Sequence, residues 1–173
     1  MSKYIWCDLE TTGTDERTCQ IIEIAVIVTD LKFNVIEQYQ TVINPGVLSY
    51  EPGALKIHKK SGLVDKIKQG ISLAEAERDV YSLIAKHEPY KRRAKLAGNN
   101  VHFDRRFMKK YMPSIPAHLS SRHLDVSSIG VLMDGQYGIE KAAYKAPRPH
   151  RALEDLQRSI AQLNFYITNF LKD

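Results

Sequence analysis

The 173-residue sequence has few cysteines and no long hydrophobic run, and these absences exclude several classes of protein. Two cysteines, Cys7 and Cys19, are too few for a disulfide framework, so free thiols in a reducing compartment are expected. No apolar run is long enough to span a membrane, and no signal-peptide core or Cys/His zinc spacing is present. We therefore expect a cytoplasmic protein without a membrane partner.

The composition that remains is that of an ordinary globular protein with an excess of positive charge. Hydrophobic residues make up 43% and charged residues 26%, so a single domain over residues 1–173 can bury a sizeable core. The net charge of +5 favours an anionic partner. The basic residues form two clusters, the second of which flanks Asp104: Lys91, Arg92, Arg93 and Lys95, then Arg105, Arg106, Lys109 and Lys110.

The order of the predicted elements indicates an α/β fold. Strands are predicted over residues 4–8, 22–30 and 35–43, and their short polar links are typical of an antiparallel meander. A helix follows over 73–87, with Ser72 as its N-cap. Strands over 95–98 and 123–126 then alternate with helices over 105–111, over 127–133 and, after a polar connector, up to about residue 171. This order predicts a mixed sheet with antiparallel N-terminal strands, flanked by helices.

Two carboxylates, Asp8 and Glu10, follow the apolar run of the first predicted strand. Residues i and i+2 of a strand face the same side, so both carboxylates point at one spot. Leaving both ionised and unpaired would be costly, and a cation between them is therefore expected. The turn signal Thr11-Thr12-Gly13 places the pair at a strand end, where a hard cation such as Mg²⁺ can also hold a substrate phosphate.

Asp104, His150 and Asp155 complete a set of residues suited to phosphoryl chemistry. Asp104 precedes a basic helical stretch, Asp155 falls near the first turn of the last helix, and His150 lies in the loop just before it. Four carboxylates and a histidine suit a two-metal site, in which a base takes a proton from the attacking water. Other acidic residues are interpreted as structural: Glu23 as a supporting group, Asp125 as a cap or ion-pair partner, and Glu154 as solvent-facing.

These residues, in this order, resemble the DEDDh family of 3′→5′ exonucleases. The matching motifs are Asp-Leu-Glu-Thr-Thr-Gly at the start, Asp104 in the middle, and His-Arg-Ala-Leu-Glu-Asp at 150–155. Within that family the chain is most similar to the oligoribonucleases, in segments such as 21–25, 61–64 and 124–127, and the resemblance covers nearly the whole chain. It implies a ribonuclease H-like fold and two Mg²⁺ or Mn²⁺ ions held by Asp8, Glu10, Asp104 and Asp155, with His150 as the general base.

The resemblance also implies a set of substrate-binding residues: Thr11, His58, Asn100, Arg122 and Ser127. Of these, His58, Arg122 and Ser127 match phosphate-binding positions of the family. Asn100 stands where the family has a serine of its 5′-phosphate cap, and Thr11 replaces a methionine of the first motif.

The family further implies a homodimer in which one subunit completes the site of the other. Ser121 stands where the donated tyrosine is usual, and Thr14 replaces a leucine that wedges against the bases. The segment 52–58 is more similar to the proofreading subunits of bacterial DNA polymerase III. These departures bear on substrate length and leave the metal ligands intact.

We therefore expect a 3′→5′ exoribonuclease that degrades short single-stranded RNA, with short DNA as a second candidate, to nucleoside 5′-monophosphates by two-metal-ion hydrolysis. One alternative is a broader DEDDh exonuclease that trims or proofreads longer single-stranded DNA or RNA, which Thr14, Ser121 and Gly53 favour. The other is a non-catalytic module that binds nucleic acid. It predicts the loss of at least one metal ligand, and none is missing.

Overall fold

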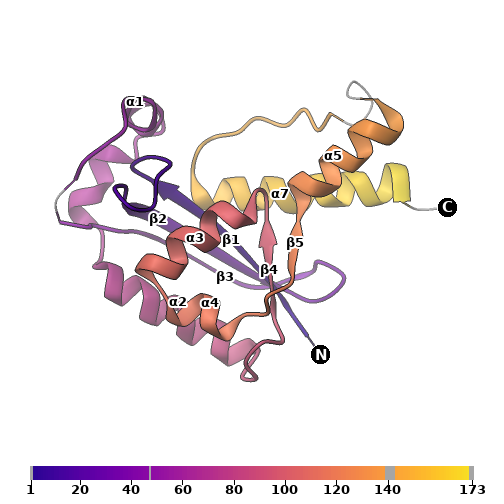
Figure 1. Cartoon of the computed structure of the whole chain (residues 1–173), viewed down its shortest axis with the longest axis horizontal. Helices are drawn as coiled ribbons and strands as arrows, with labels where there is room; N and C mark the ends of the chain where they lie inside the picture. The colour runs from indigo at the N-terminus through magenta and orange to yellow at the C-terminus, as the bar shows by residue number, and fades with distance from the viewer. Residues whose placement is uncertain (1, 47, 139–142, 172–173) are drawn as a thin grey trace.

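The computed structural model describes residues 2–46, 48–138 and 143–171, whose strands build a five-stranded sheet in the order β3-β2-β1-β4-β5 (Figure 1). Strands β1, β2 and β3 pair antiparallel, whereas β4 runs parallel to β1 and β5 runs parallel to β4. The expected mixed sheet with antiparallel N-terminal strands is confirmed. The strands are β1 (Tyr4–Thr11), β2 (Ile21–Thr29), β3 (Val35–Val42), β4 (Lys95–Gly98) and β5 (His123–Asp125).

Helices cover the sheet on both faces. Helices α2, α3 and α4 lie on one side of the strands and α5 and α7 on the other (Figure 1). None of the described helices is long and apolar enough to cross a membrane. The helices are α1 (Pro52–Lys60), the 3₁₀ helix η1 (Val64–Gln69), α2 (Leu73–His87), α3 (Val101–Tyr111), α4 (Ser114–His118), α5 (Val126–Tyr137), and α7 (Ala152–Tyr166), which continues as the π-helical turn η2 (Ile167–Leu171).

The central strand β1 divides its side chains between two cores. Ile5, Cys7 and Leu9 pack into the core beneath α2 and α3, whereas Trp6 packs into the core beneath α7. Because side chains alternate along a strand, the even-numbered Asp8 and Glu10 share the face of Trp6 and are directed toward α7. The same periodicity that builds the core therefore brings both carboxylates to the start of that helix.

Two helices differ from the sequence-based expectation. Helix α3 begins at Val101 rather than at residue 105, so Asp104 lies in its first turn and not before it. Asp104 occupies a buried, core-facing position one turn after Val101, and its charge hides the apolar spacing that marks the helix start. Helix α5 continues to Tyr137 rather than to residue 133, because Gly135 is accommodated on its exposed side and the chain turns only at Gly138, with φ +85°.

Candidate active site

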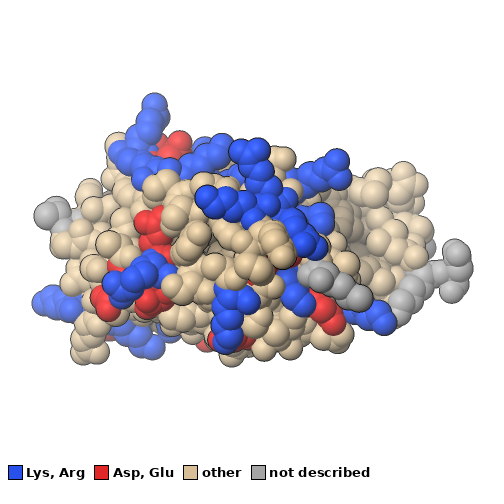
Figure 2. Space-filling model, turned by 90° about the horizontal axis from the view of Figure 1, so that it is seen from below, with Lys and Arg blue, Asp and Glu red and all other residues tan. Residues whose placement is uncertain are grey.

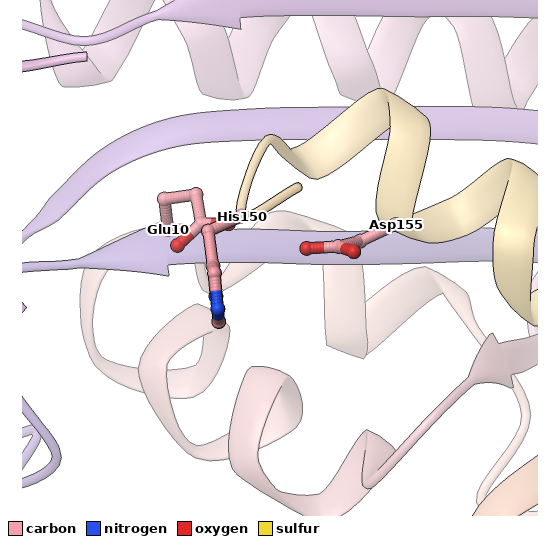
Figure 3. A group of neighbouring side chains, drawn as sticks. All are labelled: Glu10, His150 and Asp155. Atoms are coloured by element: carbon pink, nitrogen blue, oxygen red, sulfur yellow. The ribbon is translucent and has the colours of Figure 1, made fainter. Parts of the chain in front are cut away.

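Four carboxylates converge where β1 ends and α3 and α7 begin. Asp8 and Glu10 come from β1, Asp104 from the first turn of α3, and Asp155 from the first turn of α7. Glu10, His150 and Asp155 each offer one ligand atom, and these atoms lie within 4.8 Å of one another (Figure 3). The structure thus brings together the five residues that the motifs predicted for the chemistry.

Burial and mutual repulsion disfavour the charged forms of these carboxylates. Burial raises the pKa of Asp8 well above its usual range, and the charges of Asp104 and Glu10 raise it further. Burial and the charge of Asp155 raise the pKa of Glu10 to about 8. Burial likewise raises the pKa of Asp104 to about 8 and raises that of Asp155. A bound cation would relieve this repulsion and favour the ionised carboxylates.

The surroundings of Asp155 match the requirements of a divalent metal ion. Asp155 is 4% exposed, and both of its carboxylate oxygens are buried without a hydrogen-bond partner among the described residues. Asp104 differs, because its Oδ1 accepts a hydrogen bond from the backbone N–H of Leu9 at 3.0 Å. Clustered carboxylate oxygens that lack donors are ligands that hard divalent cations prefer. The residues present therefore fit the metal that the motifs predict.

Fixed contacts on its C-terminal side hold His150 beside the carboxylates. His150 has a left-handed backbone conformation with φ +57°, which turns the chain into α7. The next residue, Arg151, donates from Nη2 to Oε1 of Glu23 at 2.5 Å, and the N–H of Ala152 donates to Oε2 of Glu23 at 3.0 Å. Glu23 is therefore the supporting group that the sequence predicted, since it fixes the start of α7. Glu154, the neighbour of Asp155, is exposed, also as expected.

Two cavities lie on either side of the carboxylates. The first, of about 350 Å³, opens between α5 and α7 and is lined by Asp8 and Asp155 among other residues. The second, of about 390 Å³, lies between the end of β1 and α1 and is lined by Glu10 and His150 among others. Arg148 lines both cavities. An elongated ligand could therefore pass from one cavity to the other across the carboxylates.

Thr11 and His58 line the second cavity. Thr11 donates from its hydroxyl to the carbonyl of Gly13 at 2.6 Å, and its own carbonyl contacts Nε2 of His58 at 2.8 Å. Nδ1 of His58 lies 3.7 Å from Oε2 of Glu10, and burial lowers the pKa of this histidine. His58 is thus a buried residue of α1 that faces a carboxylate of the site.

Asn100 and Ser127 line the first cavity, whereas Arg122 does not belong to the described lining of either cavity. Both backbone N–H groups, of Asn100 and of Ser127, donate to Oδ1 of Asp125, at 3.1 and 2.9 Å. Asp125 is therefore the cap that the sequence predicted, and it ties the start of α3 to the start of α5. Arg122 is exposed and lies one residue before β5.

Sequence reasoning missed two residues at the site, Arg148 and Glu51. Nε of Arg148 lies 3.8 Å from Oδ2 of Asp155. Glu51 lines the second cavity and accepts the backbone N–H of Thr14 at 3.0 Å. The flanking Pro147 and Pro149 were an available signal for Arg148, because two prolines stiffen an otherwise polar connector. No local pattern marks Glu51.

A mixed sheet of this order, with buried carboxylates at the end of its central strand, defines a nuclease of the ribonuclease H-like class. The family model described as "Exonuclease" matches residues 5–163, and the chain belongs to this exonuclease family. Curated relatives are named oligoribonuclease. One from Francisella tularensis subsp. novicida is 38% identical over 94% of this chain and 92% of its own length. Another, from Leifsonia xyli subsp. xyli, is 36% identical over 95% of this chain and 82% of its own length.

Solved structures of exonuclease I share the fold. Exonuclease I from Methylocaldum szegediense has a TM-score of 0.74 and 22% sequence identity, and the match covers 99% of this chain and 42% of that one. Exonuclease I from E. coli, in complex with a 5cy-dT13 oligonucleotide, has a TM-score of 0.76 and 19% identity over the same shares. This chain therefore spans 42% of the length of these structural neighbours, which confirm the expected ribonuclease H-like fold.

Proposed function

We propose that this protein is a 3′→5′ exonuclease that degrades short single-stranded oligoribonucleotides to nucleoside 5′-monophosphates. The observation that carries the proposal is the buried carboxylate of Asp155, which lacks a donor among the described residues and lies beside Glu10 and His150 between two cavities. The relatives named oligoribonuclease support the substrate class. The family match over residues 5–163 supports one exonuclease domain over residues 1–173.

The carboxylates would hold the metal ions. Asp8, Glu10, Asp104 and Asp155 fit two divalent ions, Mg²⁺ or Mn²⁺, because each offers oxygen atoms and the cluster repels its own charge. Such ions, when bound, stabilise the charge that develops on the attacking and leaving oxygens of a phosphate diester. The charges of the other three carboxylates all raise the pKa of Asp8, so a cation near Asp8 would relieve the repulsion from each of them.

His150 supplies the proton transfer. A ring nitrogen of His150 takes a proton from the water that attacks the last phosphate of the chain, and the 3′-terminal nucleotide leaves as a 5′-monophosphate. The ring lies close enough to Glu10 and Asp155 to reach a water held between them. The contact between Arg151 and Glu23 keeps the backbone next to His150 in place during this step.

Basic residues on α3 and just before β5 suit an anionic strand. Arg105 and Lys109 of α3 lie close enough to His123 of β5 for their charges to lower its pKa, in addition to the larger effect of burial. Exposed Arg122 directly precedes His123. The face shown in Figure 2, seen from below Figure 1 where α2 and α4 lie, also carries many Lys and Arg side chains. These positive charges would attract a phosphate backbone without selecting its sequence.

A broader exonuclease that acts on longer single strands is the second candidate. Thr14 favours it, because this exposed residue hydrogen-bonds Glu51 and offers less apolar surface to a base than the leucine usual in oligoribonucleases. The structural neighbours include complexes of exonuclease I with single-stranded DNA. The two candidates differ in their dependence on substrate length.

A length series tests the proposal. RNA and DNA of two to twenty nucleotides, labelled at the 5′ end, are incubated with Mg²⁺ and with Mn²⁺, and the products are resolved on a gel. We expect RNA of two to five nucleotides to be cleaved fastest and mononucleotides to leave from the 3′ end. A preference for long DNA would support the second candidate, and the absence of metal-dependent cleavage at every length would overturn both.

We also propose a homodimer. Helix α5 exposes Val131 and Leu132, at 73% and 54%, and such apolar surface is often covered by a partner. Ser121, where the family has its donated tyrosine, is exposed and cannot stack on a base. Light scattering at micromolar concentration should show a dimer that Leu132→Asp converts to monomer, and a wild-type species of only 20 kDa would contradict it.

A further inference from the structure

Arg148 extends a cationic side chain to the carboxylate cluster from a loop. Its Nε lies 3.8 Å from Oδ2 of Asp155, beyond hydrogen-bond distance, and its side chain is 62% exposed. Its charge counteracts the raised pKa of four carboxylates: Asp8, Glu10, Asp104 and Asp155. The guanidinium is thus close enough to act on the whole cluster and remains free to turn toward a ligand.

Arg151 shows what a structural ion pair looks like in the same fold. Its side chain is 17% exposed, and Nη2 and Nε together bind the buried carboxylate of Glu23 at 2.5 to 3.1 Å. Arg148 has none of these features. It is mostly in solvent and approaches Asp155 through one long contact. An arginine held so loosely beside a nuclease site is suited to binding an incoming phosphate, whose oxygens fit the guanidinium as a carboxylate does.

The backbone around Arg148 is held in place although its side chain is not. Pro147 and Pro149 restrict the chain on both sides of it. Further back, Arg158 of α7 donates from Nε to the carbonyl of Ala146 at 3.1 Å and from Nη2 to the carbonyl of Tyr144 at 3.4 Å. Residues 143–150 therefore form a strap that is fastened to α7 and carries Arg148 over the carboxylates.

The position of Arg148 relative to the cavities indicates its ligand. It lines both cavities beside the carboxylates and a third, of about 410 Å³, between the strap and α1. A strand that crosses the carboxylates from one cavity to the other would pass its phosphate under this guanidinium. We propose that Arg148 is a substrate-binding residue that contacts a backbone phosphate of the RNA, and that its charge opposes divalent metal binding at Asp155.

This inference rests on the proposed function, and it predicts effects of opposite sign on two ligands. Replacement by Gln in Arg148→Gln removes a cation that competes for Asp155, so Mn²⁺ alone should bind about two- to fivefold more tightly in calorimetry, as expected for an exposed ion pair. The same variant should bind a labelled RNA pentamer about tenfold more weakly in the presence of Ca²⁺, measured by fluorescence anisotropy. If the role of Arg148 were purely structural, its replacement would weaken the binding of Mn²⁺ and of RNA together.

Salt dependence identifies the phosphate contact directly. In a plot of log affinity for RNA against log salt concentration, the magnitude of the slope should be smaller by about 0.7 in Arg148→Gln than in the wild type. This is the value for one phosphate contact to a single strand. Arg148→Lys should restore the slope but only part of the affinity, because lysine keeps the charge and lacks the planar fork. The matched control is Lys145→Gln, which removes an exposed charge from the same strap and should leave metal affinity and slope unchanged.

Failure of the proposed role of Arg148 can be distinguished from failure of the proposed exonuclease function. If the wild-type protein binds Mn²⁺ and RNA and Arg148→Gln shows the same affinities and the same slope, the role of Arg148 is wrong and the exonuclease proposal stands. An equal change in Lys145→Gln would also overturn the inference, because the loss of any positive charge from the strap would then change the two affinities. If the wild-type protein itself binds neither Mn²⁺ nor RNA, the proposed function fails.

Discussion

Two glutamates that face each other across neighbouring strands differ in the hydrogen-bond donors that surround them. Glu10 of β1 and Glu23 of β2 are paired in register and both are buried. Glu23 accepts hydrogen bonds from Arg151, from the N–H of Ala152 and from Nε2 of Gln40 at 2.9 Å. Glu10 has His58 at 3.7 Å, and its pKa rises to about 8.

The comparison shows how one sheet face can hold both a structural and a functional carboxylate. A buried charge is stable only when its environment compensates it. On β2 the protein supplies that compensation from its own side chains, and the start of α7 is fixed as a result. At the end of β1 the side chains of the protein do not supply that compensation, and a bound cation would supply it. Substitutions at Glu23 and at the carboxylates of the site distinguish the two regions.

The largest effect on activity should come from removing one of the carboxylates of the site, whose charges the protein does not compensate. Asp155→Ala or Asp8→Ala removes a metal ligand, so hydrolysis of short RNA should fall at least about a thousandfold, since metal stabilisation is worth several kcal/mol. Thermal melting in EDTA should show equal or higher stability, because one repelling charge has gone. Substantial Mg²⁺-dependent cleavage by Asp8→Ala would contradict the metal assignment.

The next effect tests whether His150 is a base or a ligand. His150→Ala should lower turnover by about 10²–10⁴-fold, the usual contribution of a general base. Calorimetry with Mn²⁺ should show metal binding close to that of the wild type, although a ring nitrogen lies near Glu10 and Asp155. Loss of metal binding would make His150 a ligand, and wild-type turnover would remove it from the mechanism.

Replacement of Glu23, whose charge is compensated by Arg151, should lower the free energy of unfolding. Glu23→Gln leaves the guanidinium of Arg151 without its carboxylate, in a position where that side chain is 17% exposed. Breaking a buried pair from one side costs about 3–5 kcal/mol, which denaturant unfolding can measure. Affinity for Mn²⁺ should not fall, because Glu23 is not a ligand and its charge disfavours ionisation of Glu10. A metal-binding defect without destabilisation would reverse the assignment of the two glutamates.

The parts of this site that could be predicted from the sequence are those set by local periodicity. Alternation along β1 was sufficient to place Asp8 and Glu10 on one face, and helix spacing separated Asp155 from Glu154. The ends of elements were harder to predict. Asp104 sits in a core-facing helical position, so its charge concealed the start of α3 at Val101.

Contacts between distant segments could not be predicted in this way. The sequence does not indicate that His58 faces Glu10, that Glu51 binds the loop at Thr14, or that Arg148 reaches Asp155. These contacts depend on how the connectors cross the sheet, which composition and periodicity do not determine. Arg122, a substrate-binding residue implied by resemblance, lies outside the described lining of both cavities, and its role stays a prediction.

The smallest effect expected is a pH dependence of the melting temperature, caused by the carboxyl groups of the site. Glu10 and Asp104 have pKa values of about 8 in the folded protein, against about 4 for unfolded carboxyls. A raised folded pKa adds stability that is fully present below pH 4 and is lost as the pH rises through about 8. The melting temperature in EDTA should therefore rise by a few degrees as the pH falls from 9 to 6. Mg²⁺ should flatten this trend because it favours the ionised carboxylates, and Asp104→Asn should reduce its slope. A melting temperature that falls steadily from pH 9 to 6 in EDTA would show that Glu10 and Asp104 are already compensated, like Glu23.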